Sequence, residues 1–191
     1  RIKFKMNTLI FIFNKSTIKN VFVQKHKHLS FLILILFFTQ NLLGQKFNYK
    51  ENAVYVYNFI KYTQWPEGKT TITIGVIGNS PIETEIKNLL SKKGNNYNVK
   101  SITITEANSI DVLIISENST KSLKEIQKLT SKLPILIITE KPDLNYLGAC
   151  ISFYMDEDDH YKTKYQISPF NLRNRKLIVS QQLLNNAELV R

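Results

Sequence analysis

The sequence predicts an α/β fold: a single-domain sandwich in which helices flank a mostly parallel sheet, followed by a C-terminal hairpin and a final helix. Two observations predict this class. Between residues 51 and 138, short runs rich in β-branched residues alternate with amphipathic segments of helical spacing. The run at 134–138 is apolar on both faces, as a central strand of a parallel sheet is.

The first expected helix covers residues 51–62, because apolar side chains recur there at i, i+3, i+4 and i+7. These are Ala53, Val56, Tyr57 and Ile60. Pro66 and Gly68 end the helix, since a proline disfavours the helical conformation at the residue before it. The β-branched run at 71–77 then predicts a buried strand.

A second helix is expected over residues 81–92. Ser80 is its predicted N-cap, Pro81 takes the first helical position, and Glu83 completes a capping box with Ser80. In such a box the serine and glutamate side chains each bond a free backbone amide of the first turn. This pattern therefore predicts where the helix begins.

The same two periodicities predict the remaining elements. A third helix covers residues 120–132, and a final helix covers 180–190. Their inward-facing residues are Leu123, Ile126 and Leu129 in the third helix, and Leu183, Leu184, Ala187 and Val190 in the final one. Strands are expected at 99–104, 110–115, 134–138, 149–155 and 161–167, the last two forming the hairpin, and a short helix begins at Phe170.

A short hydrophobic run at residues 31–38 precedes the predicted domain. Lys25 and Lys27 stand before this run and the small residue Gly44 follows it, which is the order of a secretory signal peptide. The run is too short for an ordinary membrane span, which needs about 20 apolar residues. A buried core helix and an uncleaved anchor are the alternative interpretations.

We therefore expect a signal peptide at 25–44, cleavage before Gln45, and a periplasmic domain over 45–191. Residues 1–24 are expected to be an upstream extension or part of the charged region of the signal. Seven of the 26 Lys and Arg residues lie before residue 45, where there is no Asp or Glu, so the domain has 19 basic and 15 acidic residues. These charges are scattered, and a nucleic-acid partner is not expected.

The residue inventory of the domain disfavours catalysis. Cys150 is the single cysteine of this chain, and its apolar setting predicts a small buried side chain. His160 is the single histidine after residue 45, so a histidine-rich metal site is not expected. Glu140 and Asp143 are expected to be solvated charges on a turn. The sequence indicates no enzyme, no cofactor and no metal.

Two motifs could bind a ligand, but each also has a simpler interpretation. The turn from Gly75 to Pro81 could hold a phosphate at a helix N-terminus, but it lacks the dinucleotide-binding and P-loop spacings and Pro81 lacks an amide proton. The acidic run from Asp156 to Asp159 could bind a divalent cation, but it lacks the spacing of a calcium loop. A capped turn and a solvated hairpin tip are the preferred interpretations.

The most distinctive stretch is aromatic, and it lies on the first helix and just beyond it. One face of a helix cannot bury so many rings, because side chains surround the whole helix. Either the helix is nearly enclosed, or some of the rings face a partner, where Tyr and Trp are frequent anchors. The candidates for core or partner contact are Tyr55, Tyr57, Phe59 and Trp65.

Five segments in order resemble the YfiR family, also described as the DUF4154 domain. They read AVYVYNFIKYTQWP at 53–66, IGVIGNSP at 74–81, DVLIIS at 111–116, GACISF at 148–153 and LIVSQQLL at 177–184. Together they span nearly the whole predicted domain. The resemblance rests on all five in register and not on any one of them.

The resemblance implies an exported regulator without catalytic activity that binds the periplasmic portion of an inner-membrane signalling protein. That partner is of the diguanylate cyclase or histidine kinase type, and relatives form homodimers. Some relatives carry disulfides, whereas Cys150 has no partner in this chain. Two other classes stay open: a periplasmic small-ligand or nucleotide-binding protein, and an envelope enzyme that uses the turn from Gly75 to Pro81.

Overall fold

The computed structural model describes residues 48–65, 69–94 and 96–190. The predicted signal peptide at 25–44 and residues 1–24 lie outside the described residues, and so do Pro66 and Gly68. The first described helix, α2 (Tyr49–Lys61), confirms the first predicted helix. Asn48 caps α2, because its side chain accepts a hydrogen bond from the Glu51 amide at 3.3 Å.

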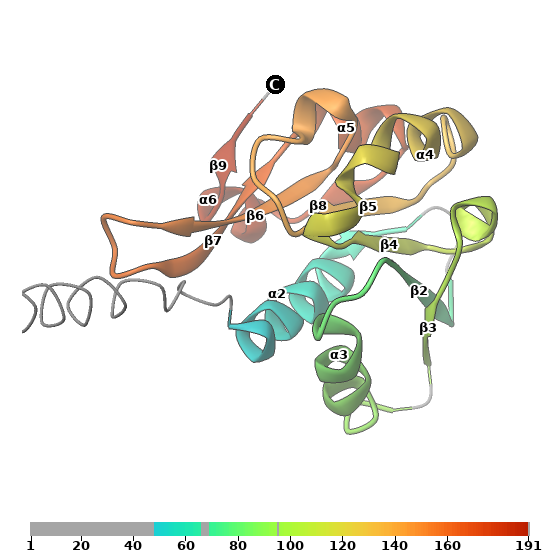
Figure 1. Ribbon diagram of the computed structural model, residues 1–191, viewed down its shortest axis with the longest axis horizontal. Coiled ribbons are helices and arrows are strands. Elements are labelled where there is room, and N and C mark those ends of the chain that lie inside the picture. Colours follow the sequence, from blue (N-terminus) through green and yellow to red (C-terminus); the bar gives the residue numbers. More distant parts are fainter. Residues whose placement is uncertain (1–47, 66–68, 95, 191) are drawn as a thin grey trace, which may run out of the picture. The chain divides into compact units, whose positions relative to one another are not determined.

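Seven strands of the described residues form the main sheet, in the order β3-β2-β4-β5-β6-β7-β9 (Figure 1). They are β2 (Ile72–Ile77), β3 (Tyr97–Ser101), β4 (Val112–Ile115), β5 (Leu136–Thr139), β6 (Ile151–Asp156), β7 (Lys162–Ile167) and β9 (Glu188–Leu189). All pairs from β3 to β6 in this order are parallel, whereas β7 runs antiparallel to β6 and β9 runs parallel to β7. The predicted mostly parallel sheet is confirmed.

Helices cover both faces of this sheet. α2 and α3 (Ile82–Leu90) lie on one side, and α4 (Leu123–Leu129) and α5 (Pro169–Asn174) lie on the other (Figure 1). A second, two-stranded sheet joins β1 (Thr63–Gln64) to β8 (Ile178–Val179). This pairing fastens the end of α2 to the chain that follows α5.

The centre of the core lies in β4 and β5, in which all four residues of each strand are buried. Central parallel strands are covered on both faces, and this is why their sequences are continuous apolar runs. The chain passes from β2 to β3 on one side and then returns to the other side of β2 to form β4. The strand order therefore reverses between β2 and β4, the place where open α/β sheets usually bind ligands.

The predicted final helix over 180–190 is wrong in its second half. A short helix, α6 (Gln181–Asn185), is followed by strand β9, which pairs with β7. The Val190 amide donates to the Ile167 carbonyl at 2.9 Å and extends this pairing. The open edge of β7 exposes backbone donors and acceptors to neighbouring segments. The hydrogen bonds that this edge forms with residues 188–190 outweigh the helical spacing of apolar residues in that segment.

The predicted capping box of α3 is only half formed. Ser80 Oγ accepts from the Ile82 amide at 3.2 Å, but the Glu83 carboxylate is bonded to Lys87 and Ser101 instead of the Ser80 amide. A complete capping box occurs at Thr103 and starts the turn η2 (Ile104–Ser109), which shortens the predicted strand at 99–104.

The predicted third helix also differs in detail. Residues 117–122 form the 3₁₀ segment η3 (Glu117–Ser122), and α4 follows it. Leu123 and Ile126 are buried as expected, but Leu129 is 45% exposed. Each step of three residues shifts a side chain by about 60° around an α-helix, so Leu129, the last residue of α4, lies away from the face that Leu123 occupies.

Candidate functional site

The structure separates the four aromatic candidates into two groups. Phe59 is fully buried, and its ring lies 4.9 Å from that of Tyr165 and 5.8 Å from that of Phe153. The Tyr55 ring meets Tyr165 edge-on at 5.4 Å. These rings form one cluster between α2 and the β6–β7 hairpin, so Phe59 belongs to the core.

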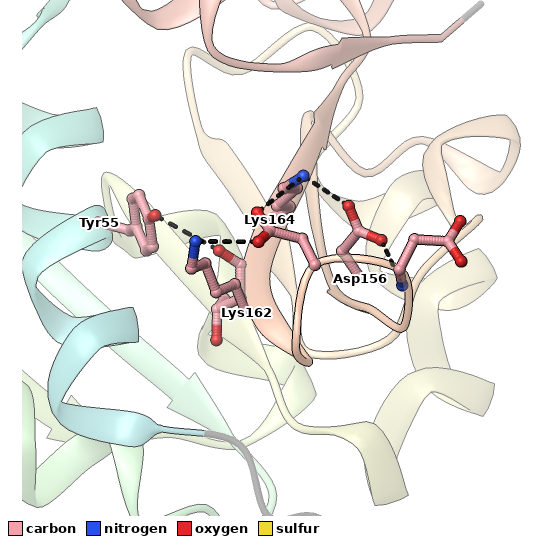
Figure 2. Close-up of polar contacts among 7 residues, drawn as sticks. Tyr55, Asp156, Lys162 and Lys164 are labelled. Atoms are coloured by element: carbon pink, nitrogen blue, oxygen red, sulfur yellow. Dashed lines mark hydrogen bonds and ion pairs between the residues drawn. The ribbon is translucent and has the colours of Figure 1, made fainter.

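Tyr55 joins this cluster to the hairpin through a polar bond. It is half-buried, and its hydroxyl donates to the Thr163 carbonyl of β7 at 3.3 Å (Figure 2). Burial raises the pKa of Tyr55, and the nearby Glu51 carboxylate adds to the effect. The hydroxyl therefore stays protonated and keeps its role as a donor at neutral pH.

Tyr57 and Trp65 lie apart from that cluster and are only partly buried. The Tyr57 ring meets the Tyr97 ring of edge strand β3 at 6.3 Å, and the Lys93 ammonium lies 5.2 Å from the Tyr57 ring centroid. Trp65 Nε1 donates to the Ile60 carbonyl at 3.4 Å. Both rings are held in place while part of their surface is exposed, which suits an anchor for a partner.

A groove lies between α2 and α3. We call it the α2–α3 groove; it has a volume of about 490 Å³. Its apolar lining includes Val54, which is 46% exposed, and the half-buried Leu89. Lys50 and Lys92 line it as well. Sequence reasoning missed Val54, although its position between the buried Ala53 and the aromatic residues could have marked it.

A group of polar side chains lies at the carboxyl ends of the parallel strands, where β5 ends. We call it the Glu140 constellation. Glu140 is only 3% exposed, and the Ser80 hydroxyl donates to its Oε1 at 2.5 Å. Burial raises the pKa of Glu140, and the Ser80 hydrogen bond offsets part of this rise. The prediction that Glu140 is a solvated turn charge is wrong, because the ends of β2, α2 and η3 cover it.

The first turn of α2 contributes to this constellation. Burial raises the pKa of Tyr49, the carboxylates of Glu140 and Glu117 raise it further, and a hydrogen bond with Ser80 opposes them. Asn52 follows one turn later, is fully buried, and has no hydrogen-bond partner for either amide atom among the described residues. The constellation is therefore polar, closely packed and acidic.

This acidity argues against phosphate binding at the turn from Gly75 to Pro81. An anion there would lie near the carboxylates of Glu140 and Glu117. The Ile82 amide, which a phosphate would need, already bonds Ser80. The turn is therefore better suited to closing the β2–α3 connection than to holding a nucleotide.

Replacing Glu140 with glutamine is expected to stabilise the protein at neutral pH. Since the pKa of Glu140 is raised above its ordinary 4.5, the folded state holds a proton more tightly than the unfolded chain, and stability falls as pH rises from about 4.5 through the folded pKa. Glu140→Gln keeps an acceptor for Ser80 and removes the charge, so we expect a gain of about 1 kcal/mol at pH 7. Urea unfolding between pH 4 and 8 measures it.

The control is Glu125→Gln, because Glu125 is an exposed glutamate on α4. Its unfolding free energy should follow that of the wild type at every pH. If wild type and Glu140→Gln show the same dependence of stability on pH, the buried carboxylate has no such effect.

Two of the four carboxylates of the acidic hairpin tip, those of Asp156 and Asp159, are paired with lysines of the adjoining strand β7 (Figure 2). Lys164 Nζ lies 2.5 Å from Asp156 and 3.4 Å from Asp159, and Lys162 Nζ lies 2.9 Å from Asp159. These bonds lower the pKa of both aspartates and raise that of Lys164. No group of three or more metal-ligating side chains converges within the described residues.

Cys150 lies at the start of β6 and is fully buried without a disulfide. Burial raises the pKa of its thiol, so the reactive thiolate is disfavoured. The structure therefore places Cys150 in the packing of the core.

Comparison with known proteins identifies the family to which this chain belongs. A family model described as YfiR/HmsC-like, DUF4154, matches residues 49–188. The chain belongs to the YfiR/HmsC-like family. The family is known for regulation of signalling proteins rather than for catalysis. No curated protein matches the chain.

A solved structure shares the fold of this YfiR/HmsC-like chain. It is a conserved domain protein from Vibrio cholerae O1 biovar El Tor, with a TM-score of 0.56 and 11% sequence identity. The match covers 75% of this chain and 60% of that one, so this chain spans about three-fifths of its neighbour's length. Among the described residues, no helix is both long and apolar enough to cross a membrane.

Proposed function

We propose that this protein is an exported, non-enzymatic regulator that binds the periplasmic portion of an inner-membrane signalling protein. The partner is a diguanylate cyclase or a histidine kinase, and the signal at 25–44 is cleaved before Gln45. Membership of the YfiR/HmsC-like family supports this role, since YfiR-like proteins are periplasmic. The residue inventory supports the absence of catalysis, because the chain after residue 45 has one histidine and one cysteine, and that cysteine is buried.

The observation that carries the proposal is the outer side of α2. It presents the exposed Val54, which lines the α2–α3 groove, and one turn further along the half-buried Tyr57. Tyr57 is already oriented by Tyr97 and Lys93, so a partner that covers its ring does not need to order it. Pre-ordered aromatic and aliphatic anchors lose little conformational entropy on binding, and they are typical centres of protein interfaces.

A small-ligand sensor is the second candidate function. The buried polar constellation of Glu140, Ser80 and Tyr49 favours it, because it lies at the edge of the sheet where ligands usually bind. The unpartnered amide of Asn52 adds a free donor and a free acceptor near the same turn of α2. The nucleotide-binding alternative has less support, since the same constellation is acidic.

A charge placed in the groove is expected to weaken partner binding. Val54→Lys replaces an exposed apolar side chain of the groove with an ammonium that the partner must cover, beside the existing charges of Lys50 and Lys92. Affinity should therefore fall by at least tenfold, about 1.4 kcal/mol. The measurement is titration of the purified protein with the periplasmic domain of the signalling protein recovered from membranes with it. The matched control is Phe170→Lys, because Phe170 is 57% exposed on α5, across the sheet.

Binding should be normal for Phe170→Lys. Equal losses for both variants, or no loss for Val54→Lys, would show that the partner does not use the α2–α3 groove. A purified protein with measurable catalytic turnover would contradict the non-enzymatic part of the proposal.

A further inference from the structure

A second cavity lies on the opposite face of the sheet, between α4 and α5. Its volume is about 320 Å³, at the small end of ligand-binding cavities. Gln127, Ser131, Lys132, Asn171, Asn174 and Arg175 line it. Both charged residues in this set are cations, and the other four carry amide or hydroxyl groups. We call this the α4–α5 cavity.

Arg175 is the unusual member of the lining, because it is a cation with only 2% of its surface exposed. Its Nη1 donates to the Thr130 carbonyl at 2.9 Å and to the Leu133 carbonyl at 3.4 Å. Its Nη2 donates to the Gln127 side-chain oxygen and to Thr130 Oγ1. Every one of these acceptors is neutral.

Among the described residues, no carboxylate pairs with Arg175 and no acceptor is bonded to its Nε–H. The carbonyls at the end of α4 carry partial negative charge and help to hold the guanidinium there, but they do not neutralise it. A buried charge without a counter-ion is costly, and burial lowers the pKa of Arg175 for this reason.

The two chain segments that line the cavity contain no acidic residue. Residues 126–139 and 160–187 contain no Asp or Glu, and Arg173 and Lys176 flank Arg175. Lys132 follows the end of α4, where a left-handed backbone (φ of 67°) turns the chain toward β5. The lining of the cavity is therefore basic and rich in hydrogen-bonding groups.

We propose that the α4–α5 cavity binds the phosphate group of a small molecule. Lys132 and the buried Arg175 supply the charge, and the side chains of Ser131 and Asn174 supply polar neighbours. The Asn171 amide group already donates to the Asn145 and Ala149 carbonyls, so it shapes the wall of the cavity instead. An oxyanion is the ligand that both a fixed guanidinium and an ammonium favour. The site uses neither the α2–α3 groove nor the Glu140 constellation, and it does not rest on the proposed function.

The location of this cavity differs from the usual ligand position in such folds. α4 ends just before β5 begins. α5 follows the end of β7, where Ile167 pairs with Ile151, the first residue of β6. The cavity therefore lies toward the amino ends of the parallel strands. Glu140 lies at their carboxyl ends, so an anion in the cavity avoids the acidic constellation.

The test is calorimetric titration of the full chain with inorganic phosphate, with thermal unfolding measured in parallel. We expect saturable binding at one site and a rise of several degrees in Tm, because a ligand that binds only the folded state stabilises it. Sodium chloride at matched ionic strength should leave Tm nearly unchanged. An equal rise with chloride would overturn the proposal, since it would report only general screening of positive charge.

Two variants locate the site. Lys132→Glu reverses an exposed charge in the lining and should weaken phosphate binding at least tenfold, whereas Lys124→Glu reverses an exposed charge elsewhere on α4 and should bind as the wild type does. Circular dichroism confirms that both fold. Equal affinities for the two variants would overturn the site, and tighter binding of acetate or citrate than of phosphate would overturn the choice of ligand.

Discussion

Replacing Phe59 with alanine is expected to lower the free energy of unfolding by about 3–5 kcal/mol. Phe59 is fully buried, and the rings of Tyr55, Phe153 and Tyr165 lie within 6.2 Å of its centroid. The surrounding rings belong to α2 and to paired strands, so they cannot move together to fill the space. The loss therefore combines lost apolar burial, lost ring contacts and an unfilled cavity.

Urea unfolding at fixed pH measures this effect. The matched control is Phe170→Ala, because the same side chain is 57% exposed on α5 and should change stability by less than about 0.5 kcal/mol. Phe59→Leu should fall between the two, since it keeps most of the buried volume. Similar stabilities for Phe59→Ala and Phe170→Ala would contradict the placement of Phe59 in the core.

Replacing Gly78 with alanine is the second change with a large expected effect, about 2–6 kcal/mol of destabilisation. Gly78 has a φ of 89°, where side chains other than glycine are strained by about 1–3 kcal/mol. A β-carbon there would also collide with the hydroxyl oxygens of Ser116 and Ser119, and overpacking adds about 1–3 kcal/mol. Gly78 thus lets the end of β2 pack closely against Ser116 and Ser119 at the start of η3.

Gly94→Ala separates the two causes. Gly94 also has a positive φ, 119°, but nothing lies within 4 Å of the place that its β-carbon would take. It should therefore show the backbone strain alone, and the difference between the two variants measures the collision at Gly78. Equal losses in urea unfolding would mean that the contact with Ser116 and Ser119 has no energetic consequence.

The local sequence was sufficient where one element decides the outcome. The apolar period of α2 is a property of neighbouring residues, and the helix forms with Ala53, Val56 and Ile60 buried. The continuous apolar run of β5 was predicted as a central strand for the same kind of reason. The order of such runs along the chain was enough to predict a mostly parallel sheet with a hairpin.

The candidate site was predicted less completely, because burial depends on segments far apart in the sequence. Glu140 follows a buried strand, and its carboxylate is enclosed only because Ser80, 60 residues earlier, hydrogen-bonds it. Arg175 is enclosed by Thr130 and Gln127 of another helix. Neither contact leaves a period or a spacing in the sequence, so neither residue could be distinguished from a solvated charge.

By itself, the sequence determined most of the central helices and strands, their order and the resemblance to the YfiR family. The tertiary structure decided which aromatic rings are enclosed, with Phe59 in the core and Tyr57 half-buried against Tyr97. It also decided that residues 188–189 form a strand, because the edge of β7 that faces away from β6 was open for pairing. Side-chain periodicity is encoded locally, whereas enclosure and strand pairing depend on which distant segments meet.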